Sequence, residues 1–231
     1  MSIRNRGIAL VYRMSALILG FCAIVYDFGI FNGEFKIINL FYFTIISNLF
    51  CLGLFLALVI KTFKEILKCG IHGTTSISPH MKGEILISIL LTMCVYHFIL
   101  IPYGLKINPY QSMKITDIIF HYCIPILTLF DWLLFDEKKS FKWYDPILWT
   151  IGPYLYIIFV FIQSKFTIAD RINAHMNDYI YAFLDVELLG DSAVILNIVS
   201  LTIVFILVGY LIYGIDRIKI VEEKNSETYL R

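Results

Sequence analysis

Few side chains within the long apolar runs of this sequence are able to do chemistry. One run carries Thr44, Ser47 and Asn48, and their i, i+3 and i+4 spacing places two hydroxyls and an amide on one face of a helix. A hydroxyl on such a face becomes a nucleophile when a neighbouring base accepts its proton. The charged or titratable side chains within the apolar runs are Arg13, Asp27, His97, His121 and Asp131. Because ionisable groups are costly in hydrocarbon, each is a candidate for a functional role.

Thr44 and His121 are expected at the same depth in a bilayer. If each run is a helix that crosses the bilayer, both residues lie about 10 Å from the outer interface, given the rise per residue of a helix. His97 falls at a similar depth, and Asp27 lies somewhat nearer the interface. The chemical interpretation is a hydroxyl nucleophile with a histidine base. The structural interpretation is that these polar groups only hydrogen bond to neighbouring helices.

Arg13 and Asp131 also share a depth, near the inner ends of their runs. An unpaired charge at that depth is costly, and an opposite charge relieves the cost. We therefore expect a structural ion pair between Arg13 and Asp131. Alternatively, Asp131 reaches the inner interface beside Trp132.

The composition is typical of a membrane protein. Of the 231 residues, 59% are hydrophobic and 16% are charged, and the mean hydropathy is +0.77. Soluble domains are about half apolar and about a quarter charged. The net charge of +1 lacks the basic field of a nucleic-acid binder, so nucleic acid is excluded as a partner. The 5 cysteines have no C-x-x-C spacing, so neither a disulfide framework nor a cysteine-based zinc site is predicted.

Six apolar runs are each long enough for a helix across the hydrocarbon, which takes about 20 residues. We therefore predict an all-α, polytopic bundle of six transmembrane helices. The predicted ranges are 8–31, 37–60, 84–103, 115–135, 146–164 and 192–214. The N-terminal end, the second and fourth loops and the C-terminal tail carry 14 Lys and Arg residues, against 5 in the other loops, so both termini are expected in the cytoplasm. We interpret the chain as one membrane domain over 1–218 with a charged tail over 219–231.

Three further features bear on the surroundings of Thr44 and His121. Pro125 follows His121 by four residues and cannot donate to its carbonyl, so the fourth helix is predicted to kink there. The fifth loop, at 166–191, mixes aromatic residues with carboxylates, which fits either an outer cap over the bundle or an interfacial aromatic belt. An apolar pocket is predicted from side chains that are alternatively ordinary lipid-facing residues. Its expected lining is Phe41, Phe43, Phe120 and Leu127.

Three segments together resemble a known family of membrane proteins. They are Phe41–Asn48, which contains F-T-x-x-S-N, His121–Phe135, which begins with H-x-x-x-P, and Phe183–Gly190. In order and depth they are similar to a bacterial six-helix membrane family related to the eukaryotic androgen-induced and androgen-dependent membrane proteins. The resemblance covers most of the chain. Ile46 and Ala182 depart from the family pattern, and neither is Thr44 or His121.

The resemblance implies an intramembrane threonine hydrolase of fatty acid esters of hydroxy fatty acids, or of related acyl esters. It implies Thr44 as the nucleophile, His121 as the base, no cofactor, membrane lipids as surroundings and the bacterial inner membrane as location. On this hypothesis an oxyanion donor comes from the helix face of Thr44, and a carboxylate orients the second imidazole nitrogen. The candidates are Asn48 and Ser47 for the donor, Asp27 and Asp185 for the carboxylate, and His97 as a further supporting residue.

Two other interpretations are open. In the first, His97, His121 and Asp27 bind zinc together with a water molecule, which is the ligand number of catalytic zinc sites. No H-x-x-x-H or H-x-x-E-H spacing accompanies them. In the second, the protein is a small transporter or a lipid-binding scaffold whose polar layer only holds the bundle together. The paired half-helices and inverted repeats of many transporters are not visible in the sequence.

Overall fold

The computed structural model describes residues 2–33, 35–107, 112–165 and 179–218, and these residues fold into helices and connecting loops without a named strand. As predicted, six helical segments are long and apolar enough to cross a membrane. They are Arg6–Asp27, Phe43–Cys69, Pro79–Lys106, Ile115–Phe135, Asp145–Lys165 and Asp191–Arg217. The protein is therefore a multi-pass integral membrane protein of the all-α class. The predicted tail at 219–231 lies outside the described residues.

Three of the six spans are continuous α-helices and three are composite. The continuous ones are α1 (Arg6–Asp27), α2 (Phe43–Cys69) and α11 (Asp191–Arg217). The third span consists of α3 (Pro79–Val95), the π-helical turn η3 (Tyr96–Leu100) and α4 (Ile101–Ile107). The fourth consists of α5 (Ile115–Ile118), the π-helical turn η4 (Ile119–Cys123) and α6 (Ile124–Phe135). The fifth consists of α7 (Asp145–Leu148) and α8 (Ile151–Lys165).

Several predicted boundaries are shifted for local reasons. The first helix ends at Asp27 rather than at 31, because the backbone turns at Gly29, where φ is 70°. The second helix begins at Phe43 rather than at 37, because Ile37–Phe41 form the 3₁₀ helix η2 and the backbone is extended before α2. The third begins at Pro79 rather than at 84, since proline is favoured in the first turn of a helix.

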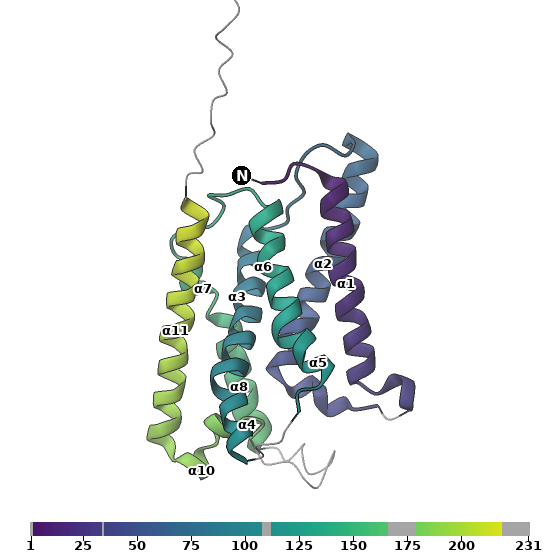
Figure 1. Cartoon of the computed structure of the whole chain (residues 1–231). Coiled ribbons are helices and arrows are strands. Elements are labelled where there is room, and N and C mark those ends of the chain that lie inside the picture. Colours follow the sequence, from purple (N-terminus) through teal and green to yellow (C-terminus); the bar gives the residue numbers. More distant parts are fainter. Residues whose placement is uncertain (1, 34, 108–111, 166–178, 219–231) are drawn as a thin grey trace, which may run out of the picture.

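Both described ends of the chain lie at the same end of the bundle, as Figure 1 shows for the start of α1 and the end of α11. The loop between α1 and α2 and the start of α5 lie at the opposite end. Helices α1, α2, α3 and α6 contact one another, and Gly20 allows α1 to approach α2, since a Cβ there would lie 2.5 Å from a methyl group of Leu52. Helix α11 packs on the other side of α3, over a buried aromatic cluster that includes Trp132, Phe141 and Trp149.

Candidate active site

The first turn of α2 and the π-helical turn η4 bring Thr44 and His121 together. Thr44 Oγ1 lies 3.2 Å from His121 Nε2. The His121 side chain is buried and Thr44 is partly buried. This distance is within hydrogen-bond reach, as required of a nucleophile and its base. The two residues that share a depth in the sequence are therefore in contact in the structure.

A hydrogen bond at the second ring nitrogen of His121, Nδ1, determines which nitrogen of the imidazole carries the proton. Nδ1 lies 2.9 Å from the backbone oxygen of Asp117, four residues earlier on the same span. A carbonyl oxygen only accepts hydrogen bonds, so Nδ1 carries a proton, and Nε2 of the neutral imidazole is then an acceptor. Thr44 consequently donates its hydroxyl hydrogen to Nε2. The geometry has the direction needed for a proton transfer from the threonine to the histidine.

The prediction that Asp27 or Asp185 orients the imidazole is wrong. The Asp27 carboxylate instead accepts a 2.7 Å hydrogen bond from the amide of Asn39. The Asp185 carboxylate accepts from two backbone N–H groups at the start of the short helix α10 (Val186–Leu189). The backbone carbonyl of Asp117 satisfies Nδ1, because a helix always places a carbonyl one turn before a side chain and no separate carboxylate is needed.

The helical irregularity predicted before Pro125 is a π-helical turn. The turn η4 ends two residues before Pro125, and the turn η3 in the neighbouring span ends two residues before Pro102. In each case the missing N–H of the proline removes a donor from the helix. Single π-helical turns of this kind are frequent at functional sites.

The two π-helical turns contact each other through their aromatic side chains. The Tyr96 ring stacks on the His121 ring with the centroids 3.6 Å apart and the planes 11° from parallel. His97 Nδ1 lies 2.9 Å from the Tyr122 hydroxyl oxygen. His97 therefore supports the turn that carries His121, although it does not contact Thr44. The stacking restricts rotation of the imidazole out of the Thr44 direction.

Ser47 and Asn48 hydrogen bond to neighbouring elements, and the N–H and O–H groups that were predicted to donate to an oxyanion have acceptors within the protein. Both hydrogens of the Asn48 amide are engaged, because Nδ2 donates to the carbonyls of Thr44 at 2.8 Å and Phe120 at 3.2 Å. The single hydroxyl hydrogen of Ser47 has the carbonyl of Thr44 at 3.1 Å and the hydroxyl of Thr92 at 2.9 Å as its acceptors. Asn48 thus connects the backbone at Thr44 to the backbone beside His121.

A largely apolar cleft reaches Thr44 from the side of α3, α8 and α11. Its enclosed volume is about 80 Å³, and it is partly open to the surroundings. Leu91 and Leu201 line it at membrane depth. The hydroxyls of Tyr154 and Thr202, which also line the cleft, lie 2.9 Å apart and connect α8 to α11.

Only one of the four predicted lining residues faces this cleft. Phe43 lines it. Phe41 stacks on an aromatic ring of α8, Phe120 is buried in a cluster with residues of α1 and α2, and Leu127 lines a separate groove along α1. The prediction failed for these three because the direction of a side chain around a helix depends on which neighbours the helix packs against.

Tyr181 is a cleft residue to which sequence reasoning gave no role. It precedes the 3₁₀ helix η5 (Ala182–Leu184), is 8% exposed and lines the cleft together with Thr44. Burial raises the pKa of Tyr181 to about 12, and hydrogen bonding to the Thr44 side chain acts in the opposite direction. The phenol therefore keeps its proton at neutral pH. The available signal was the aromatic composition of the fifth loop, whose residues 179–190 pack against the bundle while 166–178 lie outside the described residues.

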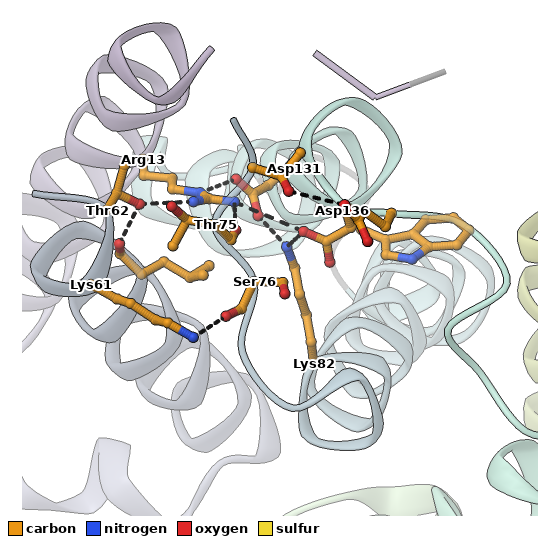
Figure 2. Close-up of polar contacts among 12 residues, drawn as sticks. Arg13, Lys61, Thr62, Thr75, Ser76, Lys82, Asp131 and Asp136 are labelled. Carbon is orange, nitrogen blue, oxygen red and sulfur yellow. Dashed lines mark hydrogen bonds and ion pairs between the residues drawn. The ribbon is translucent and has the colours of Figure 1, made fainter. Parts of the chain in front are cut away.

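A second polar site lies at the other end of the bundle, where four charged side chains form an ion cluster (Figure 2). Arg13 Nε lies 2.7 Å from Asp131, so the predicted ion pair is present. Lys82 contacts Asp131 and also Asp136, the latter at 2.7 Å. Further hydrogen bonds join Arg13 to the Thr62 hydroxyl and to a backbone carbonyl. We call Arg13, Lys82, Asp131 and Asp136 the ion cluster.

Sequence reasoning missed half of the ion cluster. Lys82 and Asp136 were assigned to loops, whereas Lys82 is 1% exposed within α3 and Asp136 directly follows α6. Burial raises the pKa of the Asp136 carboxyl, and the neighbouring Lys82 and Arg13 cations act against that rise. The proline at the start of α3 was the signal that would have placed Lys82 inside the helix.

The zinc interpretation lacks its ligands. In the part of the chain that the structure describes, no three His, Cys, Asp or Glu side chains are close enough to hold a metal ion. Both ring nitrogens of His121 have partners in the protein, and His97 and Asp27 contact other residues. The three residues proposed as ligands do not converge.

Comparisons with protein-family models, with curated proteins and with solved structures find no match to this chain.

Proposed function

We propose that this protein is an intramembrane ester hydrolase in which Thr44 is the nucleophile and His121 is the general base. The observation that carries the proposal is the 3.2 Å contact between Thr44 Oγ1 and His121 Nε2, with Nδ1 held by the Asp117 carbonyl. A threonine hydroxyl is a weak nucleophile at neutral pH and needs such a base. The apolar cleft that reaches Thr44 supplies a place for an acyl chain.

The reaction follows from the positions of the two side chains. Thr44 Oγ attacks the ester carbonyl carbon while its proton moves to His121 Nε2, and the carbonyl oxygen becomes an oxyanion. As the intermediate collapses, the bond to the alkoxy oxygen breaks and the histidine returns the proton to the leaving alcohol. Water then attacks the acyl-threonine while one of its protons moves to Nε2. As this second intermediate collapses, the bond from the acyl carbon to Thr44 Oγ breaks, the histidine returns the proton to Oγ, and the carboxylic acid is released.

The proposed substrates are lipid esters with a medium or long acyl chain. The cleft favours an apolar chain, and the segments around Thr44, His121 and Asp185 resemble threonine hydrolases of fatty acid esters of hydroxy fatty acids. Such a substrate is able to enter from the membrane without crossing water. We further propose that both termini are cytoplasmic, which places the Thr44 end of the bundle in the outer leaflet of a bacterial inner membrane.

The proposal is tested with the full chain purified in detergent and incubated with fatty acid esters of hydroxy fatty acids and with p-nitrophenyl esters. Thr44→Ala and His121→Ala should each abolish hydrolysis, and the double variant should be no worse, because the two groups act as a unit. Thr128→Ala, which removes a buried threonine lower in the span of His121, and His72→Gln, at the other end of the bundle, are the matched controls.

Covalent labelling identifies the nucleophile independently of the natural substrate. A fluorophosphonate should modify Thr44, since the same base assists attack on phosphorus, and His121→Ala should lose the label. Labelling should also weaken at acid pH, because a protonated imidazole cannot accept the hydroxyl proton. An adduct on another residue with Thr44 unmodified, or full activity of Thr44→Ala, contradicts the mechanism and leaves a lipid-binding or transport protein.

A further inference from the structure

A threonine hydrolase needs donors for the oxyanion, and the nearest side-chain amide and hydroxyl are not available for that purpose. Asn48 uses both of its N–H groups on backbone carbonyls, and the hydroxyl hydrogen of Ser47 is directed to Thr44 or Thr92. His121 donates through Nδ1 to the Asp117 carbonyl. A side-chain donor must therefore come from another residue that lines the cleft beside Thr44.

Tyr181 is a polar side chain that lines the cleft together with Thr44. Its ring contacts those of Tyr42 and Tyr156, with centroids 6.2 and 6.3 Å away, so neighbouring rings restrict its position. Tyr156 is itself fixed by a 2.9 Å hydrogen bond from its hydroxyl to the carbonyl of Phe41. The Tyr181 side chain is more than nine-tenths buried and lines the same cleft as Thr44.

The start of α2 makes the position of the Tyr181 hydroxyl favourable for negative charge. Phe43 and Thr44 are the first two residues of this 27-residue helix, and the amides of a first helical turn have no acceptor within the helix. The positive end of the helix dipole lies at the same place. Tyr181 lines the cleft together with Phe43 and Thr44 at this end of the helix.

We propose that Tyr181 is a catalytic residue whose hydroxyl, together with the Thr44 amide, donates hydrogen bonds to the oxyanion of the tetrahedral intermediate. The inference rests on the proposed function, because it assigns a role in the same reaction. It also explains why a residue of the outer loop is packed so deeply against the nucleophile.

The step conserves charge and protons without a further reactant. Before reaction the Thr44 hydroxyl donates to His121 Nε2, and the Tyr181 side chain lines the same cleft. When the bond from Oγ to the carbonyl carbon forms, the proton of Thr44 moves to Nε2 and the negative charge moves to the former carbonyl oxygen. That oxygen is bonded to the same carbon as Oγ, so it lies on the cleft side of Thr44, where the Tyr181 hydroxyl donates a hydrogen bond to it and keeps its proton.

The test compares Tyr181→Phe with Tyr179→Phe. Tyr179 is an equally buried tyrosine of the same aromatic cluster, it contacts Phe161 and it does not line the cleft. Removing one oxyanion donor lowers kcat by about 100-fold or more in other hydrolases. With p-nitrophenyl decanoate as substrate, we expect Tyr181→Phe to show such a loss of kcat, with KM changed by less than about threefold. Tyr179→Phe should keep a near-normal kcat.

An alkyl boronic acid supplies a readout that a purely structural role would not change. It forms a tetrahedral adduct with a hydroxyl nucleophile, so its affinity for Tyr181→Phe should fall in proportion to kcat, because analogues of the transition state lose the same contacts. If Tyr181→Phe does not fold, 3-fluorotyrosine at position 181 keeps the ring and strengthens the donor. Its kcat should then differ from that of the parent protein.

The outcomes separate this inference from the proposed function. Wild-type activity that depends on Thr44, combined with equal kcat and equal boronic acid affinity for Tyr181→Phe and Tyr179→Phe, overturns the role of Tyr181 alone. An unchanged kcat in the protein with 3-fluorotyrosine at position 181 also overturns the role of Tyr181 alone. If the wild-type protein neither hydrolyses esters nor is labelled at Thr44, the proposed function fails and the role of Tyr181 fails with it.

Discussion

Replacing Lys82 by methionine should destabilise the bundle by about 3–5 kcal/mol, which is the usual effect of removing one partner from a buried ion pair. The magnitude follows from the ion cluster, in which two cations face two carboxylates. Lys82 is 1% exposed, and its loss leaves Arg13 alone to compensate both Asp131 and Asp136. Arg13 lies 2.7 Å from Asp131 but 3.8 Å from Asp136, so Asp136 becomes the poorly compensated charge.

The assay is thermal unfolding of the purified protein in detergent. For a chain of this size, a loss of about 3–5 kcal/mol corresponds to a Tm lower by roughly 6–20 °C. The double variant Lys82→Met/Asp136→Asn should recover much of that loss, since it restores neutrality and keeps the contact between Arg13 and Asp131. Glu137→Gln removes the neighbouring exposed charge and should leave Tm nearly unchanged.

Acidification should reduce the defect of Lys82→Met. Burial raises the pKa of Asp136, and without the Lys82 cation that pKa rises further. A folded-state pKa above the unfolded value means that stability is lost as pH rises through the folded pKa and returns as pH falls. The Tm difference from the wild type should therefore narrow as the pH is lowered from neutral. A constant difference, or a double variant no more stable than Lys82→Met, contradicts the charge argument.

Three further substitutions test other parts of the structure. Asn48→Leu should lower kcat of the folded protein about 10- to 100-fold, measured on p-nitrophenyl esters, because a small displacement of the reacting groups has effects of this size. Leu201→Trp should shift the ratio of rates toward short-chain esters by filling the cleft, whereas Leu207→Trp, on the exposed side of α11, should not. Gly83→Ala should destabilise the protein by about 1–3 kcal/mol, because its Cβ would lie 2.2 Å from a buried indole ring; Gly53→Ala, with open space around it, should be neutral or slightly stabilising in the same thermal assay.

The six spans and the contact between Thr44 and His121 were predictable because the bilayer constrains the position of each helix along the membrane normal. The thickness of the hydrocarbon sets the length of each span, and the position of a residue within its span sets its depth. Depth alone was enough to associate Thr44 with His121, and Arg13 with Asp131. It does not specify rotation about the helix axis, which is why Phe120 and Leu127 were wrongly assigned to the cleft.

The remaining parts of the candidate site depend on contacts that no local pattern encodes. Tyr181 lines the cleft of Thr44 from a loop more than a hundred residues later, so its position depends on how that loop packs on the bundle. Lys82 was missed because a charged residue next to Gly83 reads as part of a loop, whereas its ammonium group is compensated by carboxylates from the following span. Long-range charge compensation of this kind becomes visible only when the helices are placed together.

The irregular helix at η4 explains why Asn48 matters for the proposed site. The carbonyl of Phe120 has lost both helical donors, because the N–H of Ile124 bonds to Ile119 and the next residue, Pro125, has no N–H. An unpaired carbonyl is costly inside a membrane, where no water is present to satisfy it. Asn48 supplies the missing donor from α2. The hydrogen bond that compensates the π-helical turn therefore also fixes the turn carrying His121 against the helix carrying Thr44, so the distance between base and nucleophile is set by the protein rather than by solvent.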